Sequence, residues 1–165
     1  MSASSGTIVT GAGRGIGRAI ALRMAKETAV LVVGRKSNLL SVYEEIIAGG
    51  GTASYIFGDV TDPETAKRAV EYIISGSLIV RNLVCNAGIS KGGATEMFDT
   101  NLWKEILDVN VNGSFHFIKA CLPHMLKEKR GTICLISSMA GLKGYSHTAA
   151  YTASKHALVG LAKSL

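Results

Sequence analysis

The chain has 165 residues, of which 47% are hydrophobic and 18% charged, and its formal net charge is +6. This length suits one well-packed domain, and the composition is far from that of disordered chains, which are poor in hydrophobic residues and highly charged. The longest apolar runs, such as residues 29–33, are much shorter than the roughly 20 residues that a membrane helix needs, and residues 1–10 lack the apolar core of a signal peptide. We therefore expect a single domain over residues 1–165, located in the cytoplasm, with no membrane contact.

Charge and cysteine usage exclude further classes. The basic residues are scattered, and only residues 127–130 form a basic cluster, which is typical of a solvated helix end, although a docking patch is an alternative. We therefore expect no nucleic-acid partner. Cys85, Cys121 and Cys134 show neither C-x-x-C spacing nor a histidine at metal-ligand intervals. We expect three buried, unreactive thiols and no metal site.

Short β-rich runs alternate with helical patterns along the whole chain. Strands are expected at residues 6–10, 29–34, 53–57, 78–85 and 132–136. Helices are expected at residues 17–26, 37–48, 62–74, 99–129 and 149–165, the fourth with disturbances near residues 112–113 and at Pro123. Ser37 is expected to cap the second helix, and Thr61 to form a capping box with Glu64 at the third. This order predicts an α/β fold with a Rossmann-like, doubly wound parallel sheet, which binds ligands beyond the carboxyl ends of its strands.

A glycine-rich turn follows the first expected strand and opens the first helix. It spans residues 10–17 and includes Gly11, Gly13, Arg14, Gly15, Ile16 and Gly17. Glycines let the backbone approach a pyrophosphate closely, with the helix N-terminus directed at it. The spacing is G-x-x-x-G-x-G rather than the common G-x-G-x-x-G. Such a turn can also serve only to pack a helix tightly on a strand.

The end of the second strand indicates which dinucleotide binds. An acidic residue at that position would accept a hydrogen bond from the ribose 2′-hydroxyl of NAD, but here Arg35 follows Gly34. Together with Arg14, Arg35 offers charge-assisted hydrogen bonds to a 2′-phosphate. The sequence therefore favours NADP(H) over NAD(H), with solvated surface arginines as the alternative.

Candidate catalytic residues occur in the second half of the chain. Tyr151 and Lys155 are four residues apart, so they share one face of the last helix. An adjacent ammonium stabilises a phenolate and thereby favours proton transfer near neutral pH, although such pairs also occur on many solvated helices. Ser138 follows the fifth strand, where its hydroxyl could hold a carbonyl oxygen. Asn110 is an amide in mid-helix, which suggests a local break or a buried polar role.

Taken together, these residues resemble the short-chain dehydrogenase/reductase family, in order and over the whole chain. The resemblance rests on the turn at residues 10–17, on Asn110, Ser138, Tyr151 and Lys155, and on two further motifs, Asp59-Val60 and Asn86-Ala87-Gly88. It implies an NADPH-dependent oxidoreductase that reduces a carbonyl group to an alcohol. Cys85 stands where many relatives have a second asparagine.

The resemblance also assigns roles. It implies that Asp59 and Val60 contact the adenine and that Asn86, Ala87 and Gly88 lie beneath the cofactor. It implies a catalytic tetrad in which Tyr151 donates the proton, Lys155 binds the ribose hydroxyls, Ser138 orients the carbonyl and Asn110 holds a water in a proton relay. Tyr151 and Lys155 thus belong to both the catalytic and the cofactor-binding sets.

A finer likeness concerns the substrate and the assembly. Residues 92–103 and 143–147 are similar to those of ketoreductases that act on 3-oxoacyl thioesters and polyketides. Relatives form dimers or tetramers through the two long C-terminal helices, so the resemblance implies a homo-oligomer. Relatives also continue beyond the Tyr-Lys helix into two further strands and a lid, which residues 1–165 do not include. We therefore expect an incomplete Rossmann domain with an uncovered fifth strand, and as an alternative function a non-catalytic nucleotide-binding or subunit-interaction module.

Overall fold

A computed structural model of the chain describes residues 5–35 and 37–165. Five strands form one sheet in the order β3-β2-β1-β4-β5, and every neighbouring pair is parallel. In chain order the elements are β1 (Ser5–Thr10), α1 (Gly15–Met24), β2 (Ala29–Gly34), α2 (Asn38–Ala48), β3 (Ala53–Phe57), α3 (Pro63–Ser75), β4 (Ile79–Cys85), η1 (Thr95–Met97), α4 (Thr100–Leu107), η2 (Asp108–Asn112), α5 (Gly113–Lys127), β5 (Thr132–Leu135), η3 (Met139–Gly141) and α6 (Ala149–Ser164). The predicted Rossmann-like α/β fold is confirmed.

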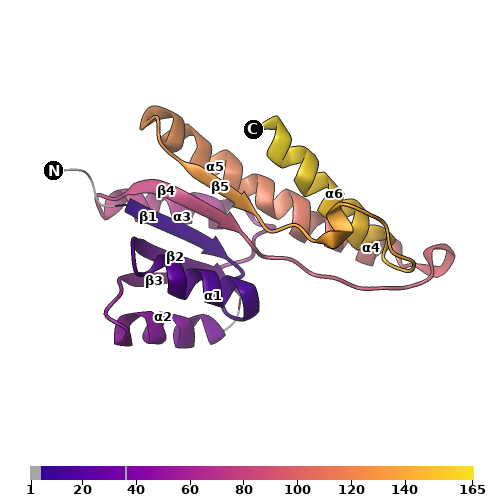
Figure 1. Ribbon diagram of the computed structural model, residues 1–165, viewed down its shortest axis with the longest axis horizontal. Coiled ribbons are helices and arrows are strands. Elements are labelled where there is room, and N and C mark those ends of the chain that lie inside the picture. The colour runs from indigo at the N-terminus through magenta and orange to yellow at the C-terminus, as the bar shows by residue number, and fades with distance from the viewer. Residues whose placement is uncertain (1–4, 36) are drawn as a thin grey trace.

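The sheet separates two apolar clusters, because alternate side chains of a strand point to opposite faces. In β2, Leu31 and Val33 face a cluster that includes Phe117 of α5, whereas Val30 and Val32 face a second cluster built with α1 and α2. Figure 1 shows α1 and α2 on one side of the sheet and α5 on the other. Both faces of the central strands are therefore covered, as the continuous apolar runs of these strands predict.

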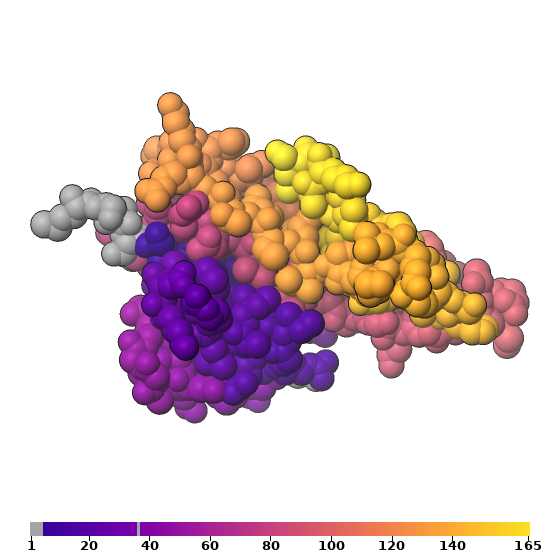
Figure 2. Space-filling model, viewed as in Figure 1, coloured from indigo at the N-terminus to yellow at the C-terminus, as the bar shows by residue number. Residues whose placement is uncertain are grey.

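Parallel pairing brings the carboxyl ends of all five strands to one edge of the sheet. The loops that leave this edge include residues 86–99 and 136–148. A 2.8 Å hydrogen bond from the Gly93 amide to the His147 carbonyl joins these two loops. Figure 2 shows the atoms near residues 95 and 145, pink and amber, gathered at one end of the molecule. The candidate site lies at this edge.

The expected long helix of residues 99–129 is divided by a π-helical turn. Helix α4 ends at Leu107, η2 is a π-helix over residues 108–112, and α5 begins at Gly113. The break predicted at residues 112–113 is thus confirmed, and it contains the buried Asn110. The disturbance expected at Pro123 does not interrupt the helix, since α5 runs from Gly113 to Lys127. That proline is exposed, so solvent can satisfy the carbonyl that loses its helical partner.

Two predicted helix caps are also wrong. The Ser37 side chain makes no capping hydrogen bond, since its backbone is already helical. At α3 the cap is Asp62, whose carboxylate accepts a 3.0 Å hydrogen bond from the Glu64 amide. Thr61 instead donates its hydroxyl to Oδ1 of Asp59 at 2.9 Å. The side chain that was expected to cap a helix thus holds a residue of the candidate site.

The three cysteines differ in their surroundings. Cys85 and Cys121 are buried, and burial raises the pKa of both thiols, that of Cys121 to about 12, so both are unreactive as predicted. Cys134, however, is exposed, which corrects the expectation of a third buried thiol. The helices α1 and α2 pack on β1, β2 and β3, and they leave Cys134 on β5 uncovered.

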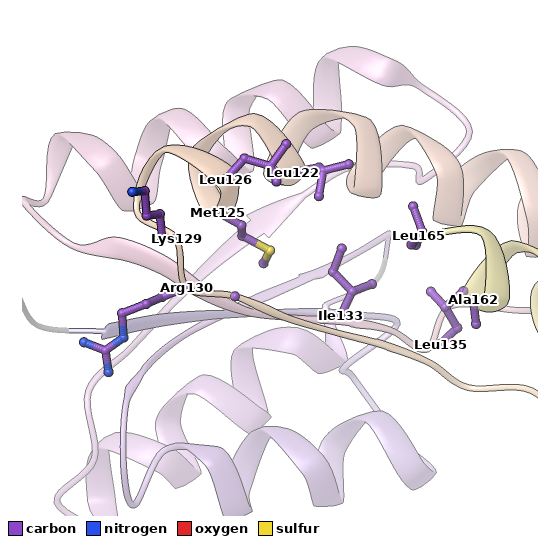
Figure 3. A pocket seen from close by; sticks show the side chains of 10 residues that line it. Leu122, Met125, Leu126, Lys129, Arg130, Ile133, Leu135, Ala162 and Leu165 are labelled. Carbon is purple, nitrogen blue, oxygen red and sulfur yellow. The ribbon is translucent and has the colours of Figure 1, made fainter.

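An apolar groove follows the outer side of β5. Its volume is about 550 Å³, and Figure 3 shows side chains of α5, β5 and the end of α6 converging on it. The lining residues are Leu122, Met125, Leu126, Lys129, Arg130, Gly131, Ile133, Leu135, Ala162 and Leu165. Among the described strands β5 pairs only with β4, so its other edge has no strand partner within residues 5–35 and 37–165.

Within the part of the chain that the structure describes, no helix combines the length and apolar character needed to cross a membrane. Across the same residues, no group of histidine, cysteine, aspartate and glutamate side chains is placed to bind a metal ion.

The groove predicts self-association of the polypeptide of residues 1–165, because the exposed side chains of Leu126 and Leu165 line it beside a strand edge that is unpaired among the described strands. Leu126→Lys, which charges a side chain that is 67% exposed at the groove, should lower the average mass measured by light scattering at least twofold. Ile47→Lys, on an exposed isoleucine of α2, is the control and should leave the mass unchanged. Equal behaviour of the two variants would contradict a role of the groove.

Candidate active site

A cleft with a volume of about 600 Å³ lies at the carboxyl edge of the sheet, between the glycine turn and the ends of β2, β3 and β4. Eleven predicted cofactor-binding residues line it: Gly11, Gly13, Arg14, Gly15, Ile16, Arg35, Asp59, Val60, Asn86, Ala87 and Gly88. Other residues that line the cleft were not predicted, among them Asn38, Leu39, Ile89 and Val109. Gly17, Tyr151 and Lys155 are outside the lining.

The glycine turn is shaped by steric limits. Gly11 has a φ of +62°, which favours glycine, and a side-chain carbon there would lie only 2.8 Å from Cα of Ala87. At Gly17 such a carbon would lie 2.5 Å from the carbonyl oxygen of Gly11. Gly17 therefore allows α1 to pack closely against the turn, and its contact with the cofactor stays a prediction.

The N-terminus of α1 opens onto the same cleft. Arg14 is the N-cap residue of α1, and its side chain makes no capping hydrogen bond. The first amides of the helix, from Gly15 onward, are thus left for an external acceptor, and the helix dipole favours a negative one. Together with the exposed cation of Arg14, this end of the cleft suits a diphosphate.

Thr10 and Asn86 fasten the turn to the end of β4. The Thr10 hydroxyl accepts hydrogen bonds from the amides of Asn86 and Ala87 at 3.0 and 3.1 Å. In return, Nδ2 of Asn86 donates to the carbonyls of Thr10 and Gly11 at 3.1 and 3.0 Å. The role of Thr10 was not predicted, although a threonine directly before a glycine turn is a signal that could have been read.

At the far end of the cleft, Arg35 lies beside Asp59. Nη1 of Arg35 is 3.2 Å from Oδ2 of Asp59, and both side chains are partly exposed. Burial alone would raise the pKa of Asp59, but hydrogen bonds from Thr61 and the charge of Arg35 outweigh it and lower that pKa. Asp59 is therefore ionised at neutral pH, and among the described residues the Arg35 guanidinium donates only to this carboxylate, which uses one of its five N–H groups.

Tyr151 and Lys155 lie one turn apart on α6, as predicted. Nζ of Lys155 is 5.6 Å from the centre of the Tyr151 ring and donates a 2.7 Å hydrogen bond to the Ile136 carbonyl. Lys155 is 5% exposed, and burial lowers the pKa of its ammonium group. A side-chain carbon at Gly88 would lie 3.7 Å from this Nζ, so the lysine adjoins the cleft.

The other two predicted catalytic residues approach from different elements. Asn110 is buried in η2, and its Oδ1 would lie 3.2 Å from a side-chain carbon at Gly88. Ser138 is the N-cap residue of η3, and its hydroxyl accepts a 3.2 Å hydrogen bond from the Ala140 amide. Helix η3 packs against α6. Gly88 is thus the position where the cleft, Asn110 and Lys155 meet.

Comparisons with known proteins agree with this architecture. The short chain dehydrogenase family pattern matches residues 6–165. The 3-oxoacyl-[acyl-carrier-protein] reductase FabG of Staphylococcus aureus (strain Mu50) is 37% identical over 169 residues, which cover 99% of this chain and 68% of the relative. The (-)-trans-carveol dehydrogenase of Rhodococcus erythropolis is 33% identical, and the matched region covers 96% of this chain and 63% of that relative.

Solved structures give the same result. A variant of actinorhodin polyketide ketoreductase, solved with NADPH, superposes with a TM-score of 0.93 at 35% identity and covers 98% of this chain. A metagenomic short-chain oxidoreductase in complex with NADP superposes with a TM-score of 0.91 at 34% identity and covers 97%. The matched region is 63% of the first structure and 74% of the second.

The fold and the cleft define a Rossmann-like protein of the dinucleotide-binding type. More particularly, this chain belongs to the short-chain dehydrogenase family, and it spans about two thirds of the length of the curated relatives that it matches.

The close contact at Gly17 predicts that Gly17→Ala will lower the free energy of unfolding by about 1–3 kcal/mol, because the new methyl group would displace the backbone of Gly11. Gly160 in α6 is the matched control, since a side-chain carbon there meets open space. Gly160→Ala should raise the free energy of unfolding by up to about 1 kcal/mol. Urea unfolding followed by circular dichroism measures both, and a Gly17→Ala variant as stable as the wild type would contradict the tight turn.

Proposed function

We propose that the chain forms the cofactor-binding and catalytic part of an NADPH-dependent reductase that converts a ketone into an alcohol. The observation that carries the proposal is the meeting at Gly88 of the nucleotide cleft with the buried Lys155, one turn from Tyr151. A nicotinamide that extends along the cleft towards Gly88 would approach the phenol that is suited to donate a proton.

The residues of the cleft fit NADP(H) along its length. Arg35, with the cation of Arg14, is available for the 2′-phosphate, and the uncapped amides of α1 are available for the diphosphate. Asp59 and Val60 are proposed to contact the adenine, and Asn86, Ala87 and Gly88 to support the nicotinamide half. The NADPH and NADP bound to the two similar structures support this choice.

The proposed mechanism assigns one task to each catalytic side chain. When bound, NADPH supplies the hydride that reduces the carbonyl carbon. The Tyr151 hydroxyl donates its proton to the carbonyl oxygen, which yields the alcohol, and Ser138 donates a hydrogen bond that orients this oxygen. Lys155 holds the ribose hydroxyls and keeps a positive charge beside the phenol, which favours proton release.

Asn110 is proposed to hold a water in the relay that returns the proton to Tyr151. Its Oδ1 accepts one hydrogen bond, from the Ile89 amide, and an amide oxygen has two lone pairs. A side-chain carbon at Gly88 would lie 3.2 Å from this Oδ1 and 3.7 Å from Nζ of Lys155, so both groups adjoin the glycine at the cleft. This supports a relay along that side of the cleft.

The proposed substrate is a 3-oxoacyl or polyketide-type ketone, on the ground of the similarity to FabG and to actinorhodin ketoreductase. We further propose a homo-oligomer formed through α5 and α6. The alternative is a module that binds the nucleotide without turnover. NADPH binding without NADPH oxidation in the presence of a 3-oxoacyl thioester would support the alternative.

Arg35→Ala should weaken NADPH binding by about 10- to 100-fold, because one charge-assisted hydrogen bond to the phosphate is lost. The affinity for NADH, which lacks this phosphate, should change little. Titration of cofactor fluorescence measures both dissociation constants. Arg18→Ala is the matched control, since Arg18 is paired with Glu45 at 2.5 Å outside the cleft, and equal losses for NADPH and NADH in Arg35→Ala would refute phosphate recognition.

Tyr151→Phe should lower kcat at least about 100-fold, since it removes the proton donor, and leave NADPH affinity nearly unchanged. NADPH oxidation with a 3-oxoacyl thioester measures the rate. Tyr72→Phe is the control, because the Tyr72 hydroxyl lies 2.6 Å from Ser54 on the opposite edge strand. A Tyr151→Phe variant with wild-type turnover would exclude the proposed mechanism.

A further inference from the structure

A buried serine connects two members of the proposed tetrad. Ser154 has no exposed surface, and its hydroxyl donates a 2.7 Å hydrogen bond to the carbonyl of Tyr151, three residues earlier in α6. The same oxygen accepts a 2.9 Å hydrogen bond from Nδ2 of Asn110 in η2. The hydroxyl therefore has one partner on the helix that carries Tyr151 and Lys155, and one in the π-helical turn.

The amide of Asn110 is held on its other side by Ile89. Oδ1 accepts a 2.8 Å hydrogen bond from the Ile89 amide, and Nδ2 donates a 3.0 Å hydrogen bond to the Ile89 carbonyl. This pair fixes which end of the amide carries the hydrogens, and the second hydrogen of Nδ2 goes to Ser154. Ile89 follows Gly88 directly, so one chain of hydrogen bonds joins the floor of the cleft, η2 and α6.

We propose that Ser154 is a positioning residue that sets the place of α6 relative to Gly88 and Asn110, an inference that rests on the proposed function. Without its hydroxyl, one buried hydrogen of the Asn110 amide would have no partner. Among the described residues no other side-chain hydrogen bond joins α6 to η2, so the part of α6 that carries Tyr151 would shift relative to Asn110, while Lys155 would keep its bond to the Ile136 carbonyl. Small displacements of reacting groups are costly in rate, because catalysis depends on alignment.

Ser114 offers a matched comparison. It is also a buried serine, and its hydroxyl donates a 2.9 Å hydrogen bond to the same residue, Asn110. That bond goes to the main-chain carbonyl four residues earlier and does not involve the amide or α6. If Ser154 serves only to fill the core, then Ser154→Ala and Ser114→Ala should have similar effects.

The test is a double-mutant cycle of Ser154→Ala and Asn110→Ala, with Ser114→Ala as control. Ser154→Ala should lower kcat about tenfold while the KM and the NADPH dissociation constant change less than about twofold. In the Asn110→Ala background, Ser154→Ala should cause almost no further loss, since the bond is already broken. Additive losses, or a Ser114→Ala variant with the same loss of kcat, would overturn the proposal.

A readout without turnover separates this inference from the proposed function. The fluorescence emission of bound NADPH reports the surroundings of the nicotinamide. Ser154→Ala and Asn110→Ala should each change this emission, and their effects should not add in the double variant. Ser114→Ala should leave the emission unchanged. A wild type that binds NADPH but does not oxidise it would refute the reductase function alone, and the emission cycle would then decide the role of Ser154. Unchanged emission in Ser154→Ala would refute the positioning role whatever the activity.

Discussion

The hydrogen bonds between Thr10 and Asn86 are the interaction on which the rest of the site depends. Two loops leave neighbouring strands, β1 and β4, and loops at a sheet edge are ordinarily the most mobile parts of a fold. The Thr10 hydroxyl accepts two hydrogen bonds from the main-chain amides of Asn86 and Ala87, and the Asn86 side chain donates two to the carbonyls of Thr10 and Gly11, each worth about 1 kcal/mol. They hold the glycine turn against residues 86–88, and the close contact of Gly11 with Ala87 follows from this.

The side of the site that was proposed to be catalytic places polar side chains in the core. Asn110, Ser154 and Lys155 are all buried, and an unpaired polar group in such a place costs about 1–3 kcal/mol. Among the described residues, every buried side-chain nitrogen and oxygen has a hydrogen-bond partner. The partners come from different elements, since Lys155 donates to Ile136 and Asn110 to Ile89. A network satisfied in only one arrangement favours that arrangement, which is what a catalytic constellation requires.

The sequence was informative where the causes are local. Strands and helices were predicted from apolar periodicity, and the turn at residues 10–17 from its glycines, because both depend on neighbours in the chain. Asn38 was missed because it reaches the cleft only after α2 folds against the turn, and Ser154 because its partner Asn110 is 44 residues away. The expected burial of Cys134 failed for a similar reason, since exposure on β5 depends on which helices cover that face of the sheet.

The two halves of the site, one at β1 and one at β5, differ in how many neighbouring strands hold them in place. The cofactor half is built on β1, the central strand, which pairs on both sides, whereas β5 pairs only with β4 among the described strands. Yet the segment that leaves β5 provides Ile136, whose carbonyl holds Lys155, and Ser138. The apolar groove lies against this same strand. Any surface that covered the groove would therefore restrict the motion of β5. Through Ile136 it would also restrict the position of Lys155. The packing of the groove and the alignment of the Lys155 ammonium are thus physically linked.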